Sequence, residues 1–278
     1  MLRNYDLEEI FRYISPLMLY TRHLGFKQFE QALAAGDAKA RELRAAVAEV
    51  EEVMLARADI SANAVYRFFP AHSDENRVLI YDADAKTTLT TFIFGRQSEP
   101  PHLCLAGYVA PVGSGRADYV CFFATTIGAG VRALADKWKE KGEYLRSHIL
   151  QALALESAEA FAELLHKKIR AMWGIGDPPG LTMKDLFQAR YHGRRYSFGY
   201  PACPRLEDQA KLFRLLNLEA TIDLRLTEGF MMDPESSVSA MVFHHPEAKY
   251  FALSQADAQA LERALGDEAE TTGARASF

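Results

Sequence analysis

The sequence has few cysteines, no long apolar run and no block of basic residues. Its three cysteines, Cys104, Cys121 and Cys203, are odd in number and form no Cys-x-x-Cys pair. This disfavours a disulfide framework and a structural zinc site, and it favours a reducing compartment. The apolar stretches have the length of strands and are too short to span a membrane. Because 32 Lys and Arg residues stand against 37 Asp and Glu residues, with a net charge of −5, a nucleic acid is not an expected partner.

The N-terminus also lacks a recognisable targeting signal. Residues 1–6 become acidic at Asp6 and contain no apolar segment of the kind that forms the core of a signal peptide. We therefore expect a cytoplasmic protein with no membrane partner. Of its 278 residues, 49% are hydrophobic and 25% charged, which is an ordinary globular composition with enough apolar residues for a sizeable core. No internal repeat and no shift in composition divides the chain, so a single domain is predicted.

Along the sequence, segments with helical patterns come before and after a central region with strand patterns. Residues 1–60 are predicted to be an N-terminal helical segment of the domain, 61–255 its core, and 256–278 a C-terminal helix with a tail that is disordered after Gly266. Asp6 is the predicted N-cap of a short helix that ends at Phe11. The other predicted helical ranges are 17–25, which is apolar on most faces and predicted to be buried, 27–57 with an interruption at residues 36–37, 131–173 with a break near residue 142, 182–190 and 207–216.

The strand patterns predict an antiparallel arrangement. The predicted strands are residues 64–69, 77–81, 87–94, 103–105, 119–123, 238–243 and 249–253. Short polar links join the first five of these strands. Such links favour an antiparallel meander, because a parallel sheet needs a long crossover between each pair of strands.

Residues 128–133 match the dinucleotide-binding pattern G-x-G-x-x-A, follow a predicted strand and open a predicted helix. A Rossmann unit needs a second parallel strand roughly 30 residues later. The sequence instead keeps a helical pattern as far as Trp173. A strand-to-helix turn is the favoured interpretation, and a nicotinamide-binding oxidoreductase is the least favoured alternative.

The residues show no catalytic group and no metal ligand set. His244 and His245 are adjacent on a predicted strand, so their side chains point to opposite faces and cannot easily share one ion. No pattern of a nucleophile with its base is present. We therefore predict no catalytic residue and no metal ligand in this chain.

The segment from Arg194 to Pro204 differs from the rest of the chain. Pro201 and Pro204 restrict the backbone, Gly199 permits a turn, and aromatic residues alternate with small ones. A rigid loop with an arginine at its start suits a ligand that carries a carboxylate, because a guanidinium pairs bidentately with that group. A structural loop with a surface arginine fits the same residues equally well.

The same segment carries a resemblance to a known family. Residues 199–204 (GYPACP), preceded by Arg195, resemble the signature of the activation domain of cobalamin-dependent methionine synthase, which binds S-adenosylmethionine. Further similar segments occur in family order and together span roughly residues 10–255. They are residues 103–106, 109–111, 117–119, 159–163 with His166, 226–232, 237–239 and 245–251. Such a series is much more specific than any single motif.

The resemblance implies a fold and a function. The implied fold is α+β, a single C-shaped domain with a central twisted antiparallel sheet flanked by helices. The implied function is S-adenosylmethionine binding in support of the reductive methylation of cob(II)alamin to methylcobalamin on a separate cobalamin-binding domain, with a flavodoxin-type electron donor. The enzyme is a methyltransferase, and we do not expect this chain to make methionine alone. Because the metal and the sulfonium carry the chemistry, the protein contributes positioning.

The resemblance also implies the site residues. Arg195 is expected to bind the ligand carboxylate, the main chain around Ser197 with Tyr200 and Ala202 to line the ligand, and Tyr250 with Phe251 to form an aromatic wall. Glu159 is either a partner of the ligand ammonium group or a solvated helix carboxylate.

Three positions depart from the family pattern. Tyr13 and Ala189 stand where acidic residues occur in the family, and Phe251 replaces the second tyrosine of a Tyr-Tyr pair. The resemblance therefore leaves a further alternative, a non-catalytic docking module whose ligand site has decayed.

Overall fold

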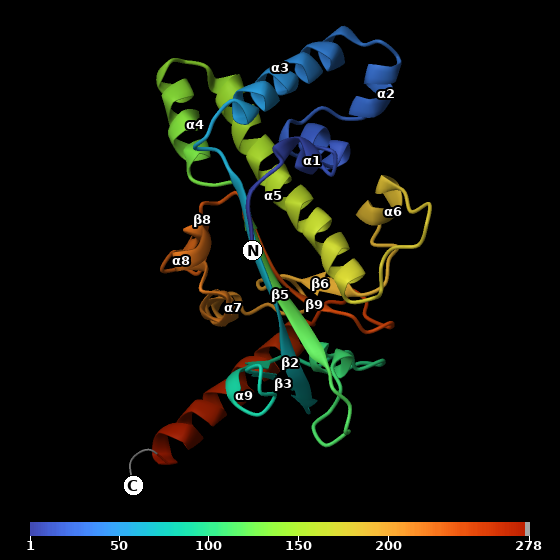
Figure 1. Cartoon of the computed structure of the whole chain (residues 1–278), viewed down its shortest axis with the longest axis vertical. Helices are drawn as coiled ribbons and strands as arrows, with labels where there is room; N and C mark the ends of the chain where they lie inside the picture. Colours follow the sequence, from blue (N-terminus) through green and yellow to red (C-terminus); the bar gives the residue numbers. More distant parts are fainter. Residues whose placement is uncertain (276–278) are drawn as a thin grey trace. The chain divides into compact units, whose positions relative to one another are not determined.

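The computed structural model describes residues 1–275, and it has a central antiparallel sheet flanked by helices (Figure 1). Seven strands form the main sheet in the order β4-β3-β2-β5-β9-β6, with β1 also paired to β2. Their bounds are β1 Leu2–Tyr5, β2 Ala62–Asp74, β3 Arg77–Tyr81, β4 Thr88–Ile93, β5 Tyr119–Thr126, β6 Arg194–Tyr196 and β9 Ser237–Phe243. The strands β7 (Arg225–Leu226) and β8 (Met232–Asp233) form a separate pair.

Contacts within the chain define two compact units. The first unit contains Met1–Tyr66, Phe123–Tyr191 and Leu216–Ser239, and the second contains Arg67–Phe122, His192–Leu215 and the residues from Ala240 onward. Each unit is assembled from three separate stretches of chain. No shift in composition along the sequence could therefore mark the division.

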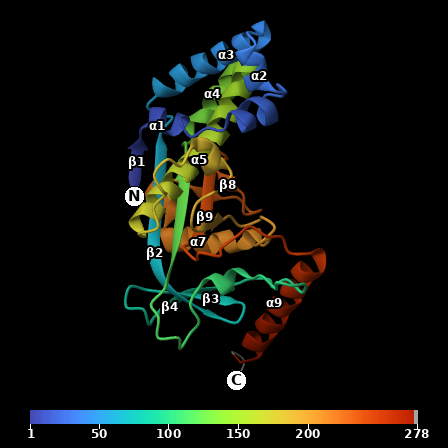
Figure 2. The same cartoon turned by 90° about the vertical axis from the view of Figure 1, so that its right-hand side faces the viewer.

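Most helices belong to the first unit, where the long helix α5 packs against α3 and α4 (Figures 1 and 2). The helices of this unit are α1 Leu7–Phe11, a π-helix at Leu17–His23, α2 Phe29–Ala34, α3 Ala38–Leu55, α4 Gly130–Glu140, α5 Tyr144–Met172, α6 Met183–Phe187 and α8 Leu218–Ile222. The remaining helical elements are 3-10 turns at Leu105–Tyr108 and Leu206–Asp208, α7 Gln209–Leu216 and α9 Gln255–Arg275.

Local capping explains several of these boundaries. The carboxylate of Asp6 accepts a hydrogen bond from the Glu8 N–H at the start of α1, and that of Asp37 accepts one from the Ala40 N–H at the start of α3. The predicted cap at Asp6 is therefore confirmed, and the predicted interruption at residues 36–37 falls directly before α3. The predicted break between α4 and α5 is also present, at Gly142, which has a φ of +79°.

Three sequence predictions were wrong. Residues 103–105 form no strand, and a 3-10 turn follows at Leu105–Tyr108. Residues 249–253 form no strand either. Strand β9 instead lies between β5 and β6, and the sequence did not reveal β6. In the segment predicted to be buried at residues 17–25, Leu17 and Met18 are 58% and 41% exposed.

Helix α9 continues past Gly266, where the sequence predicted a disordered tail, and residues 276–278 of that tail lie outside the described residues. None of the helices in residues 1–275 combines the length and the apolarity needed to cross a membrane.

Candidate functional site

Of the predicted site residues, Arg195 lies on β6, the last strand in the order of the sheet, and Ser197, Tyr200 and Ala202 follow it in the chain. Arg195 stands opposite Val242 of β9 in antiparallel register, and its side chain is half-buried. Because side chains alternate along a strand, Arg195 points away from the face that Arg194 and Tyr196 share. A guanidinium in this place can donate two parallel hydrogen bonds to a carboxylate at the edge of the sheet.

A tight loop at residues 199–204 follows β6. The Gly199 N–H donates to the carbonyl of Cys203 at 3.0 Å, and the Cys203 N–H donates to the carbonyl of Tyr200 at 2.9 Å. Gly199 has a φ of +84°, and a Cβ at this position would come within 3.1 Å of Leu206 Cδ1. The backbone conformation therefore favours glycine here, and the space beside it is tight.

Cys203 ties this loop back to the chain that precedes it. Its thiol donates a hydrogen bond to the Ser197 carbonyl at 3.0 Å. Burial, followed by the nearby Asp208 carboxylate, raises the pKa of the Cys203 thiol to about 12, so the thiol stays protonated. The adjacent Ala202 is 4% exposed. The loop therefore has a fixed main chain at the positions predicted to line a ligand.

The chain beyond β9 returns to the same loop. The Leu253 N–H donates to the Pro201 carbonyl at 2.9 Å, which brings Tyr250 and Phe251 beside the loop. The ring of Tyr250 is 55% exposed, and that of Phe251 is half-buried. Six of the seven predicted site residues thus lie in the second unit on neighbouring pieces of chain. They are Arg195, Ser197, Tyr200, Ala202, Tyr250 and Phe251.

Tyr196 supports the ring of Tyr250 and was not predicted as a site residue. The two rings meet edge to face with centroids 5.6 Å apart, and the guanidinium of Arg194 lies 6.0 Å from the Tyr250 centroid. The alternation of residues 194–196 could have indicated that Tyr196 shares a face with Arg194. The second buried tyrosine beside it, Tyr108, carries no sequence signal of this kind.

The seventh predicted residue, Glu159, belongs to the first unit, where it is exposed on α5. One turn earlier on α5, Glu156 is buried, with its Oε1 2.9 Å from His23 Nε2. Burial raises the pKa of Glu156, the hydrogen bond with His23 opposes this shift, and the carboxylate of Glu159 adds to it. The two glutamates therefore lie on the same side of the helix.

Two of the positions that depart from the family pattern also lie in the first unit. Tyr13 accepts a hydrogen bond from Lys167 Nζ at 3.3 Å, and the same ammonium group lies 5.7 Å from the Tyr13 ring centroid. Position 13 thus has a partner on α5 in its own unit. Ala189 has a φ of +51° in the turn after α6.

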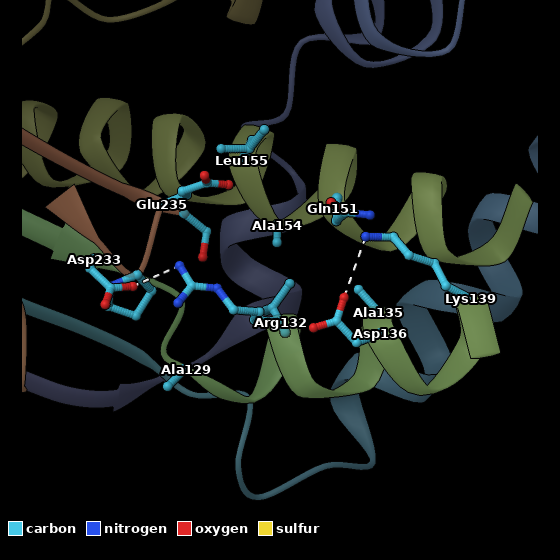
Figure 3. A pocket seen from close by; sticks show the side chains of 13 residues that line it. Ala129, Arg132, Ala135, Asp136, Lys139, Gln151, Ala154, Leu155, Asp233 and Glu235 are labelled. Carbon is cyan, nitrogen blue, oxygen red and sulfur yellow. Dashed lines mark hydrogen bonds and ion pairs between the residues drawn. The ribbon is translucent and has the colours of Figure 1, made fainter. Parts of the chain in front are cut away.

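A cavity of about 360 Å³ in the first unit lies between α4, α5 and residues 233–236 (Figure 3). Four of the five charged side chains that line it form two pairs. Arg132 donates to Asp233 at 2.7 Å, and Lys139 lies 3.4 Å from Asp136. Most of the charge on the cavity wall is therefore neutralised by these ion pairs within the protein.

The Gly-x-Gly pattern at the start of α4 serves close packing. A Cβ on Gly130 would overlap the carbonyl oxygen of Asp59. Gly128 has a φ of +85°, and a Cβ added to it would lie 3.2 Å from the carbonyl oxygen of Ser61. The chain continues from α4 into α5 and not into a second parallel strand. The glycines therefore fit a strand-to-helix turn and not a Rossmann unit.

The two adjacent histidines have different partners. His244 Nε2 lies 2.7 Å from Asp118 Oδ1, whereas His245 Nδ1 accepts a hydrogen bond from the Glu247 N–H at 3.2 Å. Among the residues described, no group of three or more His, Cys, Asp or Glu side chains is placed to hold a metal ion.

The fold and this edge define an α+β domain with a candidate ligand site beside the last strand of an antiparallel sheet. A family model described as "Vitamin B12 dependent methionine synthase, activation domain" matches residues 6–264. The chain belongs to this family, which forms one domain of a cobalamin-dependent methyltransferase. The sequence-based resemblance is thereby confirmed.

A solved structure described as the MetH reactivation domain bound to AdoHcy is similar to this chain. The TM-score is 0.87 with 29% sequence identity, and the match covers 95% of this chain and 85% of that chain. The mixed α/β fold with its antiparallel sheet, predicted from the sequence, agrees with this neighbour.

Proposed function

We propose that this chain binds S-adenosylmethionine along β6 and supports the reductive methylation of cob(II)alamin to methylcobalamin on a separate cobalamin-binding domain. The observation that carries the proposal is the hydrogen bond from Leu253 to Pro201, which joins the arginine-led loop to the aromatic segment. The solved neighbour, whose ligand AdoHcy is the demethylated form of S-adenosylmethionine, supports it.

The residues at the site match the parts of this ligand. The Arg195 guanidinium suits the carboxylate, and the main chain of Ser197 and Ala202 with the ring of Tyr200 suits the adenosine and methionine portions. The faces of Tyr250 and Phe251 suit a sulfonium cation, because aromatic rings attract positive charge.

The reaction leaves the protein the task of positioning. One electron reaches cob(II)alamin from a flavodoxin-type donor. The methyl carbon–sulfur bond of the ligand then breaks, its electron pair stays on sulfur, and a carbon–cobalt bond forms, which yields S-adenosylhomocysteine and methylcobalamin. By holding the ligand in one orientation, with its methyl group directed at the metal, the protein lowers the entropic cost of bringing the two reactants together. In this proposal the chain works in the cytoplasm beside the other domains of the synthase.

Calorimetric titration with S-adenosylmethionine tests the site. We expect the wild type to bind and Arg195→Ala to bind about ten- to a hundredfold more weakly, because hydrogen bonds to a charged group are lost. Arg195→Lys should fall between them, since lysine keeps the charge but not the bidentate geometry. Arg116→Ala, an exposed arginine in the same unit, is the matched control and should bind like wild type. No heat with wild type, or unchanged binding by Arg195→Ala, contradicts the proposal.

A second experiment separates the proposal from a docking module with a decayed site. The chain is mixed with a cobalamin-binding domain of methionine synthase, S-adenosylmethionine and a one-electron reductant, and methylcobalamin is followed by its absorption spectrum. We expect methylcobalamin to form, and to form more slowly with Arg195→Ala. Binding of the cobalamin domain without methylation favours the docking module.

A further inference from the structure

Two buried hydroxyl groups meet at one peptide group beside the candidate site. Tyr196 Oη donates a hydrogen bond to the Lys249 carbonyl oxygen at 2.8 Å. Tyr108 Oη lies 3.4 Å from the same oxygen and also accepts from the Lys249 N–H at 3.4 Å. The two tyrosines are only 4% and 6% exposed. Each hydroxyl thus has a partner on the main chain, and both the N–H and the carbonyl of Lys249 are engaged.

The rings of these tyrosines are held independently of their hydroxyl groups. Tyr196 packs against Phe243 with centroids 5.7 Å apart, and it lies nearly parallel to Tyr108 at 6.3 Å. Tyr108 also approaches His245 at 5.7 Å. A change from tyrosine to phenylalanine therefore removes the hydrogen bond to Lys249 and leaves the ring packing in place.

Both hydroxyl groups keep their protons at any pH at which the protein works. Burial raises the pKa of Tyr196 above its usual value, and the neighbouring tyrosines raise it further. Burial also raises the pKa of Tyr108. Both hydroxyl groups therefore remain able to donate to the Lys249 carbonyl.

The segment that receives these bonds has no strand to hold it. Residues 248–254 are irregular. Hydrogen bonds to tyrosine side chains and to a loop carbonyl therefore hold the chain on either side of Tyr250. Before Tyr250, the Lys249 peptide is bound by the tyrosine hydroxyls. After it, the Leu253 N–H is bound by the Pro201 carbonyl at 2.9 Å.

We propose that Tyr196 and Tyr108 are positioning residues, which fix the exposed ring of Tyr250 at the ligand site through the peptide group of Lys249. The effect on ligand binding rests on the proposed function, whereas the effect on the segment does not. Tyr196 follows Arg195 directly in the chain. Strand β6 therefore supplies the arginine proposed to bind the carboxylate from one face, and the support for the ring of Tyr250 from the other.

The first test needs no ligand. Backbone hydrogen exchange of residues 248–253 is compared in wild type, Tyr196→Phe, Tyr108→Phe and the double variant. We expect exchange in this segment to be about three- to tenfold faster in Tyr196→Phe, since one buried hydrogen bond is lost. Tyr108→Phe should have a smaller effect, because its contacts are longer, and the double variant the largest. Tyr119→Phe, which changes a 43% exposed tyrosine in the same unit, should exchange like wild type.

The second test asks whether Tyr196 acts through Tyr250. Affinity for S-adenosylmethionine is measured for Tyr196→Phe, for Tyr250→Ala and for both changes together. We expect Tyr196→Phe alone to weaken binding about three- to tenfold. In the Tyr250→Ala background it should change binding by less than about twofold, because the ring that it places is absent. A general loss of structure would instead weaken binding equally in both backgrounds.

The two tests fail in different ways. Unchanged exchange in Tyr196→Phe and in the double variant overturns the positioning role. An equal loss of affinity with and without Tyr250 overturns the action through that ring. If wild type binds no S-adenosylmethionine but exchange still rises in Tyr196→Phe, the positioning of the segment stands and the proposed ligand is rejected.

Discussion

The guanidinium of Arg170 donates two hydrogen bonds to the carboxylate of Asp177, from Nε to Oδ1 at 2.7 Å and from Nη2 to Oδ2 at 2.8 Å. The Arg170 side chain has no solvent exposure, and its guanidinium lies 3.7 Å from the centroid of the Tyr191 ring. Glu163 approaches from another side, with an Oε1–Nη1 distance of 4.0 Å. This pair joins the last turn of α5 to the loop that follows it.

We expect Asp177→Ala to lower the free energy of unfolding by about 3–5 kcal/mol, because a buried cation loses its bidentate partner. Urea denaturation followed by tryptophan fluorescence measures the change. Asp136→Ala, which removes an exposed ion pair with Lys139, is the control and should cost less than about 1 kcal/mol. Equal losses in the two variants would show that the buried pair contributes no more than the surface pair.

Asp118 should make stability depend on pH. It accepts hydrogen bonds from the Ala110 N–H, the Tyr119 N–H and His244, each at 2.7 Å. Burial alone would raise the pKa of Asp118, but these hydrogen bonds outweigh it and hold the pKa below its usual value. A carboxylate whose pKa is lower in the folded state stabilises that state above about pH 4, and this contribution is lost as the pH falls through the folded-state pKa.

Asp118→Asn should therefore destabilise the protein more at pH 7 than at pH 3 in urea denaturation at both values. Asp74→Asn, at a carboxylate that is 54% exposed, should shift stability little at either pH. A loss from Asp118→Asn that is the same at pH 3 and pH 7 would mean that the ionised carboxylate has no special role.

The three thiols should be unreactive in the folded protein. Cys104, Cys121 and Cys203 are all buried. Burial raises the pKa of each thiol, to about 12 at Cys203, and the thiolate is the reactive form. With a chromogenic disulfide reagent at pH 8, we expect less than one thiol to react rapidly in native protein and all three to react in guanidinium chloride. Rapid reaction of a native thiol would show that its site opens to solvent.

The sequence predicted those elements whose signals are local. Asp6 and Asp37 cap helices through their own side chains, and Gly142 supplies the positive φ that separates α4 from α5. The hairpin from β2 to β3 follows the polar turn near Asn76. In each case the residues that make the structure are neighbours in the chain, so a pattern of residues was enough.

Distant partners explain what the sequence did not reveal. Residues 249–253 are rich in aromatic and apolar residues like a strand, but their hydrogen bonds go to the hydroxyl of Tyr196, the carbonyl of Pro201 and the side chain of Gln97. Strand β6 has three residues, too few to show a period. The loop around Gly199 was recognised because its residues are contiguous. The supporting Tyr108 was missed because it comes from a segment some 90 residues earlier in the chain.

The turn at Gly130 gives a test that separates packing from dinucleotide binding. A Cβ on Gly130 would overlap the Asp59 carbonyl oxygen and would lie 2.8 Å from the carbonyl carbon. We expect Gly130→Ala to lower the free energy of unfolding by about 1–3 kcal/mol through overpacking, despite the higher helix propensity of alanine. Gly229→Ala, where the added methyl group meets no atom within 4 Å, should be close to neutral.

The same samples decide the nucleotide question. Wild type mixed with NADH or NADPH should leave the fluorescence of the nicotinamide unchanged, since the glycines of this turn pack against the backbone of Asp59 and Ser61 and α4 is followed by α5. A fluorescence change that disappears in Gly130→Ala but persists in Gly229→Ala would instead assign a nucleotide to this turn. Destabilisation of Gly130→Ala without any fluorescence change in wild type assigns the glycine to packing against Asp59 alone.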